Sequence, residues 1–437
     1  MTYTEALRWI HSRLAFGSRP GLDRIEALLD LLDNPQNKIK TIHVAGTNGK
    51  GSTVSFLRSL LEGEGLKVGT FTSPYITVFN ERIALNNQPI SNQELVALVE
   101  RFQPLVASLD AQPALAGVTE FEIITAMMFT YFAEAQVDVG IIEVGLGGTL
   151  DCTNVITPLI ASITTIGLDH MAILGNTLEE IAAQKAGIIK AYRPVVTGNL
   201  PEVALKVIRE VSAKFKSPLI ELGQGYQFKL EEKQGAFGEV FTFTNQQFTL
   251  PHLEISLNGQ HQIENASLAI ELYCQVAPDF EYIATEATIR AGIQFVAWPG
   301  RMEVLQTAPL VILDGAHNEP AIKVLVNNLQ QEYQGKAIKT VFAAIQPKEV
   351  GSMLNLLGEV ENQELFLTTF DYPKAYQLKE YPLLSHLPVT HLPDWQVGIE
   401  QLIKAGTSAD LILITGSLYF ISQVRTHILG GSNEKTV

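Results

Sequence analysis

The chain has 437 residues, more than one hydrophobic core usually serves, so its length favours two domains. Apolar residues make up 46% of it, which excludes a disordered chain, and the formal net charge of −15 argues against broad nonspecific binding to nucleic acid. Its two cysteines, Cys152 and Cys274, lie far apart without the spacing of a metal site or a disulfide framework, which fits a reducing compartment.

The first 16 residues predict an amphipathic helix, with Tyr3, Leu7, Ile10 and Leu14 on one face and charges between them. This pattern is not that of a secretory signal. No uncharged apolar run approaches the roughly 18 residues that a membrane span needs. We therefore expect a soluble, cytoplasmic protein without a membrane partner.

Residues 39–45, 51–64 and 66–71 read as strand, helix and strand, the βαβ unit of a mostly parallel sheet. The segment between the first strand and the helix is close to a phosphate-binding loop, but Val44 replaces its first glycine and Gly51 follows Lys50. Amides at a helix start attract an anion, and Lys50 would reach the β and γ phosphates. An ordinary glycine-rich turn is the alternative. The nucleotide-binding candidates are Gly46, Thr47, Asn48, Gly49, Lys50, Gly51, Ser52 and Thr53.

Helices are predicted over about 92–107 and 121–135, followed by a strand over 137–144. Alternation places Glu143 at the end of a buried apolar row, where an unpaired charge is costly and Mg²⁺ is a natural partner. Ser73 follows the strand 66–71 and would emerge at the same sheet edge, where its hydroxyl could supply the metal ligand that Gly51 lacks. A solvated glutamate and a plain Ser-Pro turn are the alternatives. Tyr75, close behind, could stack on an aromatic ligand or pack locally.

The helix expected after the capping box Thr177–Glu180 carries Lys185 inside its apolar stripe. Burial would lower the pKa of this lysine, which must then pair with an acid, lose its proton or be modified, for example by CO₂ as a carbamate. Alternatively, the amine reaches solvent along its own stem. His170, just before this helix, is either a metal ligand or a satisfied loop histidine.

Residues 218–258 alternate with period two around a glycine-bearing turn, so antiparallel hairpins are expected at one edge of the sheet. Two helices, about 261–277 and 284–295, lead to Pro299 and Gly300, where we place the domain boundary: 1–297 and 298–437. The second part alternates strands and helices, as in a Rossmann-like α/β domain, with strands over 310–316, 339–345, 364–370 and 410–416.

Asp314 and His317 lie at the end of a strand of this second domain, the usual place for ligand contacts in an open α/β sheet. A plain helix cap is the alternative for Asp314. Arg301, beside the hinge at 296–300, could close on a nucleotide. We expect a locally basic cleft between the domains, with Arg82 and Arg301 as candidates, and domain closure that excludes water.

Eight motifs in chain order together resemble the folylpolyglutamate synthase and dihydrofolate synthase family of the Mur ligase superfamily. They are "HVAGTNGKGST", "TSPYITVFNERI", "IIEVGLGGTLDCTN", "GLDHMAILGNTLEEIAAQKAGIIK", "GQHQIENA", "WPGRMEV", "LDGAHN" and "LILITGSLYF". The resemblance implies ATP-dependent amide ligation. The terminal carboxylate of a folate attacks the γ-phosphate, and the amine of L-glutamate then displaces phosphate from the acyl phosphate.

The resemblance also implies roles for single residues. In this family the loop with the extra glycine is the normal form, Ser73, Glu143 and His170 match magnesium ligands, and Lys185 matches a carbamylated lysine. Asn265, Arg301 and Asp314 match residues that hold ATP, and His317 and Ser417 lie near the reaction centre. The catalytic candidates are Lys50, Lys185, Asp314 and His317, and the substrate-binding candidates are Tyr75, Arg82 and Ser417.

Two other functions compete with this one. A Mur-type amino-acid ligase normally carries a UDP-binding domain before its P-loop, whereas 45 residues precede Gly46 here. A non-catalytic P-loop nucleotide sensor would lack the second α/β domain. Within the family, "SPYI" in place of Ser-Pro-His-Leu leans toward glutamylation of folates without that of dihydropteroate. We expect a monomer with small-molecule substrates and no nucleic-acid partner.

Overall fold

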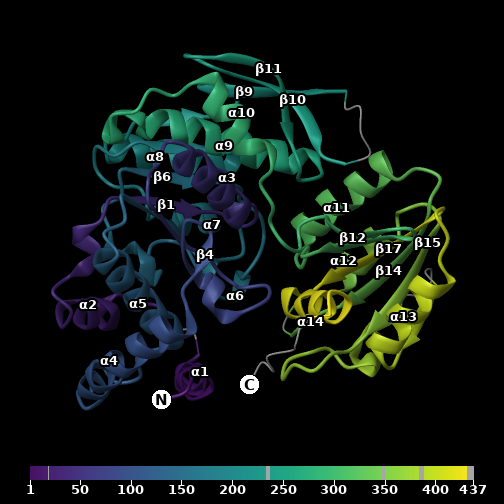
Figure 1. Ribbon diagram of the computed structural model, residues 1–437, viewed down its shortest axis with the longest axis horizontal. Coiled ribbons are helices and arrows are strands. Elements are labelled where there is room, and N and C mark those ends of the chain that lie inside the picture. The colour runs from purple at the N-terminus through teal and green to yellow at the C-terminus, as the bar shows by residue number, and fades with distance from the viewer. Residues whose placement is uncertain (18, 233–236, 347, 349, 383–387, 431–437) are drawn as a thin grey trace.

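The computed structural model describes residues 1–17, 19–232, 237–346, 348, 350–382 and 388–430. Two α/β units lie side by side, each built around its own sheet, and the chain passes from the first to the second through residues 295–302 (Figure 1). The expected α/β class, with a larger P-loop unit and a smaller Rossmann-like unit, is confirmed.

The first sheet has eight strands in the order β4-β3-β2-β5-β1-β6-β7-β8. The six strands from β2 to β8 in this order run parallel, and β3 and β4 add an antiparallel edge. Because parallel strands end at the same sheet edge, the chain leaves β1, β2 and β5 close together. The strands are β1 Thr41–Ala45, β2 Val68–Phe71, β3 Ile83–Leu85, β4 Gln88–Pro89, β5 Val139–Glu143, β6 Ile160–Ile163, β7 Val195–Thr197 and β8 Leu219–Glu221.

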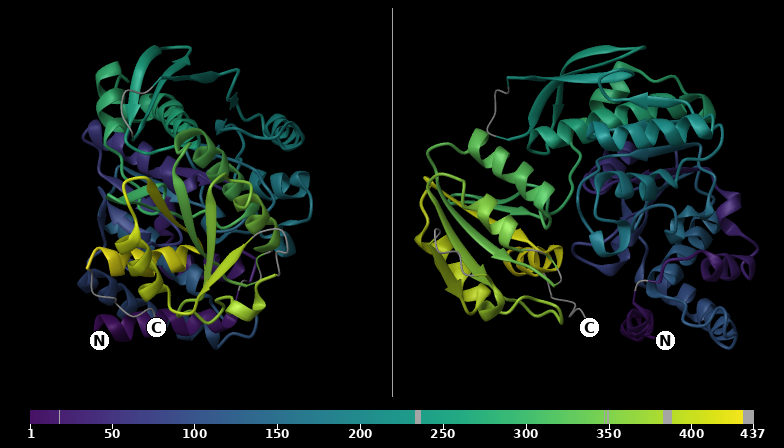
Figure 2. Two further views of the ribbon diagram at one scale, coloured as in Figure 1. Left: turned by 90° about the vertical axis from the view of Figure 1, so that its right-hand side faces the viewer. Right: turned by 180° about the vertical axis from the view of Figure 1, so that it is seen from behind.

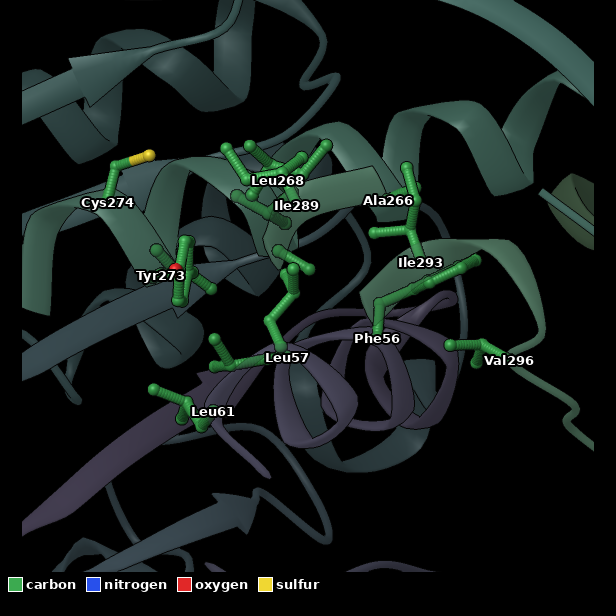
Figure 3. Packing of buried hydrophobic residues seen from close by; sticks show 14 of the residues in the cluster. Phe56, Leu57, Leu61, Ala266, Leu268, Tyr273, Cys274, Ile289, Ile293 and Val296 are labelled. Atoms are coloured by element: carbon green, nitrogen blue, oxygen red, sulfur yellow. The ribbon is translucent and has the colours of Figure 1, made fainter. Parts of the chain in front are cut away.

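Helices cover both faces of this sheet, since its central strands are buried on each side. On one face α3 packs against α9 and α10, where Phe56, Leu57 and Ile293 interdigitate (Figure 3). On the other face α5 is flanked by α1, α2 and α4, and α7 and α8 cover the β6–β8 end. The helices are α1 Tyr3–Ser12, α2 Asp23–Asp30, α3 Lys50–Gly63, α4 Asn92–Asp110, α5 Glu120–Glu134, α6 Met171–Leu174, α7 Leu178–Ala186, α8 Glu202–Lys214, α9 Gln260–Val276 and α10 Glu286–Gln294.

The expectation for residues 218–258 is partly wrong. Residues 219–221 form β8, which extends the main sheet in parallel, and the hairpins are not at its edge. Instead β9 Tyr226–Glu231, β10 Glu239–Asn245 and β11 Thr249–Ile255 form a separate antiparallel sheet, seen at the top of Figure 1. Its apolar face, including Phe241 and Phe243, packs on the core around α9. The expected glycine-bearing turn falls in part on residues 233–236, which lie outside the described residues.

The second sheet has six strands in the order β12-β13-β17-β14-β15-β16, parallel except for β12. Both β12 and β16 lie at edges and were not expected, because their strand patterns are short and half-exposed. Figure 2 shows this unit beside the first from two further directions. The elements are β12 Glu303–Thr307, β13 Leu310–Asp314, α11 Glu319–Glu332, β14 Ala337–Ala343, α12 Val350–Leu357, β15 Gln363–Thr368, β16 Val389–Leu392, α13 Trp395–Ala405, β17 Asp410–Gly416 and α14 Leu418–Ile428.

The loop after β2 crosses from the first unit to the second. Ile76 is 5% exposed and belongs to the apolar cluster around α13 and α14. The carboxylate of Glu81 accepts hydrogen bonds from the backbone amides of residues 76, 77 and 78, which shapes the loop.

Among the described helices, none has the length and apolar character that crossing a membrane would require.

Candidate active site

Two adjoining cavities lie between the two units. The first, of about 270 Å³, is lined by the loop 46–52 and by side chains from both units. The second, of about 970 Å³, shares Ser73, His170 and His317 with the first. Between them the cavities bring together these predicted site residues: Gly46, Thr47, Asn48, Gly49, Lys50, Gly51, Ser52, Ser73, Arg82, Glu143, His170, Lys185, Asn265, Arg301, Asp314, His317 and Ser417.

Two predicted residues do not line either cavity. Thr53 is fully buried, with its hydroxyl 3.5 Å from the Asn265 side-chain oxygen. Tyr75 packs on Phe79 with the ring centroids 5.8 Å apart, and the Arg82 guanidinium lies 5.2 Å from its ring centroid. The local-packing alternative therefore describes Tyr75 in this structure, and a direct substrate contact is not what its position provides.

The glycines of the loop after β1 are required by backbone shape and by close neighbours. Gly49, the N-cap of α3, has φ of 84°, a left-handed conformation, and a Cβ there would lie 2.4 Å from Asn265 Oδ1. At Gly51 an added Cβ would lie 2.6 Å from the ring of Trp298. A β-carbon at either position would have to displace Asn265 or Trp298, so both glycines are required by their surroundings.

Lys50, Glu143 and Ser73 form the polar centre of the first cavity. The Lys50 amine donates to the carbonyl oxygens of Gly46 and Thr47 at 3.0 and 3.2 Å, and it lies 3.9 Å from Glu143 Oε1. The Ser73 amide donates to Glu143 Oε2 at 3.1 Å. Burial raises the pKa of Glu143 to about 7, although the Lys50 charge and the Ser73 amide act in the opposite direction. A cation beside this carboxylate would keep it ionised.

Lys185 lies on α7 and is 4% exposed, so the expected burial is confirmed. Burial and the nearby charge of Lys50 lower its pKa to about 7, so much of the amine is neutral near that pH. Among the described residues, no hydrogen bond or ion pair is formed by the Lys185 amine. An unpaired, partly neutral buried amine is open to modification by CO₂.

His170 stands at the N-terminus of the short helix α6 with φ of 51°, and its side chain is half-exposed. Its neighbour Asp169 pairs with Lys348 from the second unit. Burial disfavours the charged form of Asp169, but the positive charges of His170 and Lys348 prevail and hold the pKa of this carboxyl below its usual range. Sequence reasoning missed Asp169 and Lys348, and only the motif "GLDHMAILGN" around Asp169 marked this stretch.

The second unit contributes Arg301, Asp314 and His317 to the first cavity. The Asp314 carboxylate accepts hydrogen bonds from the amides of Met302 and Ala316 at 3.0 and 2.9 Å, and burial raises its pKa. His317 Nδ1 lies 2.8 Å from the Gly315 carbonyl oxygen, which can only accept, so Nδ1 is the protonated nitrogen. Burial lowers the pKa of His317 to about 4, so the ring is neutral and leaves Nε2 free to accept.

The second cavity is the larger and the more basic of the two. Five cationic side chains line it: Arg13, Arg19, Arg82, Lys348 and Lys374. Aromatic and aliphatic groups, among them Phe121, Leu150 and Tyr372, line the rest. The expected basic cleft is present at the second cavity, where Arg82 is one of the five cations and three carboxylates oppose them. Arg301 lines the first cavity, which has three cations against four carboxylates and is therefore not basic. Such a surface suits a flat ring system that ends in carboxylates.

Glu143 and Ser73 offer oxygen ligands for magnesium at the wall of the first cavity. Within the described part of the chain, no three His, Cys, Asp or Glu side chains gather as a metal-binding group. Mg²⁺, however, is commonly held by one or two carboxylates together with water and substrate phosphates. Glu143 and the Ser73 hydroxyl beside it fit that arrangement, because Glu143 Oε1 has Lys50 at 3.9 Å as its nearest charged partner.

Comparisons with known proteins agree with this geometry. Residues 44–273 match the Mur ligase middle domain, and residues 300–418 match the Mur ligase glutamate ligase domain. The dihydrofolate synthase/folylpolyglutamate synthase of Bacillus subtilis is 43% identical over 98% of this chain and 99% of its own length. The folylpolyglutamate synthase of Lacticaseibacillus casei is 37% identical over 99% of this chain and 100% of its own.

Solved structures of such enzymes are similar as well. An FPGS complex with AMPPCP and folate covers 98% of this chain and 100% of its own, with a TM-score of 0.86 and 36% identity. The folylpolyglutamate synthase of Mycobacterium tuberculosis, complexed with ADP and AMPPCP, covers 98% and 99%, with a TM-score of 0.87 and 30% identity.

Proposed function

Since this chain belongs to the folylpolyglutamate synthase and dihydrofolate synthase family of Mur ligases, we propose how its own residues carry out the family's reaction. The protein is an ATP-dependent ligase that joins L-glutamate to a folate. The observation that carries the assignment of roles is the pair of adjoining cavities, one around the P-loop and one lined by cations. A nucleotide sensor binds no second substrate, so it would not need the second cavity.

In our proposal the first cavity holds ATP. The backbone amides of residues 49–51, at the start of α3, bind the phosphates, since the amides of Thr47 and Asn48 already donate to Thr165. The Lys50 amine moves from the carbonyl oxygens of Gly46 and Thr47 to the β and γ phosphates. Asn265 and Arg301 line the same cavity and hold the nucleotide from the α9 and hinge sides.

The second cavity holds the folate, and its cations neutralise the carboxylates. The terminal carboxylate oxygen attacks the γ-phosphorus, the bond to the β–γ bridging oxygen breaks, and ADP leaves. The amine nitrogen of L-glutamate then attacks the acyl carbon, phosphate departs, and the nitrogen loses a proton. His317 is shared by both cavities, and its neutral Nε2 can accept that proton.

Glu143 and Ser73 would hold Mg²⁺, with His170 at the same cavity wall as a third candidate. A bound magnesium ion supplies charge neutralisation for the phosphates. Its presence would also resolve the electrostatic cost of a buried Glu143. Lys185 would be carbamylated, since burial and the nearby cation Lys50 both favour the neutral amine that reacts with CO₂. The carbamate would be anionic and would face Lys50.

The choice of acceptor remains a prediction. Tyr75 and Ile76 in the "SPYI" stretch lean toward folates alone, but neither residue lines a cavity, so the structure offers them no direct route to the acceptor. One relative carries both activities in its name and the other carries one. A monomer in the cytoplasm likewise stays a prediction, which sedimentation and cell fractionation would check.

The test is ATP-dependent incorporation of labelled L-glutamate by the purified protein, with tetrahydrofolates and with dihydropteroate in parallel. We expect incorporation with tetrahydrofolates, and incorporation with dihydropteroate would add the second activity. Lys50→Ala and Glu143→Ala serve as inactive controls. If the protein binds ATP but incorporates no glutamate, the assignment of the second cavity is contradicted. A non-catalytic nucleotide sensor is then the better interpretation.

A further inference from the structure

The P-loop and the second unit are joined by one buried side-chain amide. Asn318, the N-cap of α11, is 4% exposed. Its Oδ1 accepts from the Ala321 amide at 2.9 Å and from Asn48 Nδ2 at 3.2 Å. Its Nδ2 donates to Asn48 Oδ1 at 3.2 Å and to Asp169 Oδ2 at 2.8 Å. An asparagine amide offers two donors and two acceptor positions, so the hydrogen-bonding capacity of Asn318 is fully used.

Three of these four bonds cross from the second unit to the first, and a second contact reinforces them. Asp169 accepts from Asn318 through Oδ2, and through Oδ1 from the Lys348 amine at 2.5 Å. Its side chain is 10% exposed. Charge-assisted hydrogen bonds shielded in this way are stronger than neutral ones. The second unit therefore engages both oxygens of one carboxylate of the first.

The Asn48 side chain starts from a backbone that the P-loop holds tightly. The Asn48 amide donates to Thr165 Oγ1 at 2.9 Å, and the hydroxyls of Thr164 and Thr165 donate to the Asn48 carbonyl oxygen at 2.5 and 3.0 Å. The direction of the Asn48 side chain is thus set by the shape of the loop. Nearby, a Cβ on Gly167 would lie 2.9 Å from Pro320, so the first turn of α11 is seated closely on the first unit.

We propose that Asn318 and Asp169 are positioning residues for glutamyl transfer, which dock the second unit on the P-loop and hold its reacting groups at the acyl phosphate. The proposal rests on the proposed function. Asn318 follows His317 directly, and Lys348 lines the second cavity, so the docking contact sets the place of both. Both cavities draw side chains from the second unit, and attack by the glutamate amine adds the requirement that His317 lie close to the acyl carbon.

Asn318→Asp isolates the contact, because aspartate also caps a helix N-terminus and would keep the bond from the Ala321 amide. It removes the two donors of Nδ2 and sets a carboxylate against that of Asp169. We expect kcat for glutamate incorporation to fall about 100-fold, the scale of a displaced reacting group. ATP affinity should stay close to that of the wild type, and hydroxylamine should still trap the acyl phosphate as a hydroxamate.

The exchanged pair Asp169→Asn with Asn318→Asp tests whether the two residues act through each other. In this double variant the new amide at position 169 would donate to the new carboxylate at position 318, restoring one bond across the units while Lys348 loses its partner. We expect the exchange to recover about tenfold of the lost kcat, the coupling of directly bonded residues. The matched control is Asp394→Asn, which changes the cap of α13, outside both cavities, and should leave kcat unchanged.

Each outcome decides between the possibilities. Wild-type kcat in a folded Asn318→Asp variant would overturn the proposal, and so would a loss that the exchanged pair does not recover. A fall in ATP affinity as large as the fall in kcat would assign the pair to nucleotide binding instead. If the wild-type protein itself incorporates no glutamate with any folate, the proposed function is wrong. This result differs from failure of the positioning proposal, which is seen only in the variants.

Discussion

Replacing Glu143 by glutamine should remove activity and at the same time stabilise the ligand-free protein. Glu143 is 4% exposed, and burial raises its pKa from 4.5 to about 7. A difference of about 2.5 pKa units corresponds to about 3 kcal/mol at roughly 1.4 kcal/mol per unit. The attraction of Lys50 at 3.9 Å is already contained in this shift. Glutamine has the same shape and can still accept from the Ser73 amide.

The sign of the pH dependence follows from ionisation in the two states. Below about pH 4.5 the carboxyl is protonated in both the folded and the unfolded chain, so its ionisation costs nothing. Above about pH 7 it is ionised in both, and the folded state bears the full penalty. The advantage of Glu143→Gln should therefore be about 3 kcal/mol at pH 8 and should shrink as the pH falls toward 5.

Urea unfolding followed by circular dichroism, in buffer with EDTA at pH 8 and at pH 5, measures this difference. Glu210→Gln, on the exposed face of α8, is the matched control and should change the free energy of unfolding at neither pH. Added MgATP should stabilise the wild type and have much less effect on Glu143→Gln. A Glu143→Gln variant that is less stable than the wild type at pH 8, or equally stable, would refute the reasoning.

Three further predictions concern the cavities. Gly51→Ser should weaken ATP binding about tenfold in calorimetry, because the serine Cβ would lie 2.6 Å from the ring of Trp298. Adding Trp298→Leu to this variant should remove the steric clash and restore the affinity. An unchanged ATP affinity in Gly51→Ser would contradict this explanation. Arg82→Ala should raise the KM for folate roughly tenfold or more through loss of a cation, while Tyr75→Phe should leave it unaltered; equal effects would place Tyr75 on the substrate after all. Protein exposed to ¹³C-bicarbonate should show a carbamate resonance that Lys185→Met lacks, and an active wild type without this resonance would exclude the carbamate.

The local features of the site could be predicted from the sequence because each has a signal within a few residues. Gly49 and Lys50 between an apolar strand and a helix indicate an anion-binding loop. The alternation before Glu143 places a carboxylate at a strand end, and the helical stripe around Lys185 predicts its burial, which the structure confirms. Eight motifs in order were enough to indicate the family, which the comparisons then confirmed.

Only the tertiary structure decided which of these residues share a cavity. Asn318 and Asp169 lie 149 positions apart, and Lys348 lies 179 from Asp169, so no local pattern links them. Tyr75 packs on Phe79 and Arg82, and the hairpins of residues 226–255 leave the main sheet to cover α9. Strand periodicity and turn residues are local properties of the chain, whereas the partner of a side chain is set by how two sheets and their helices pack together, and that packing depends on the whole fold.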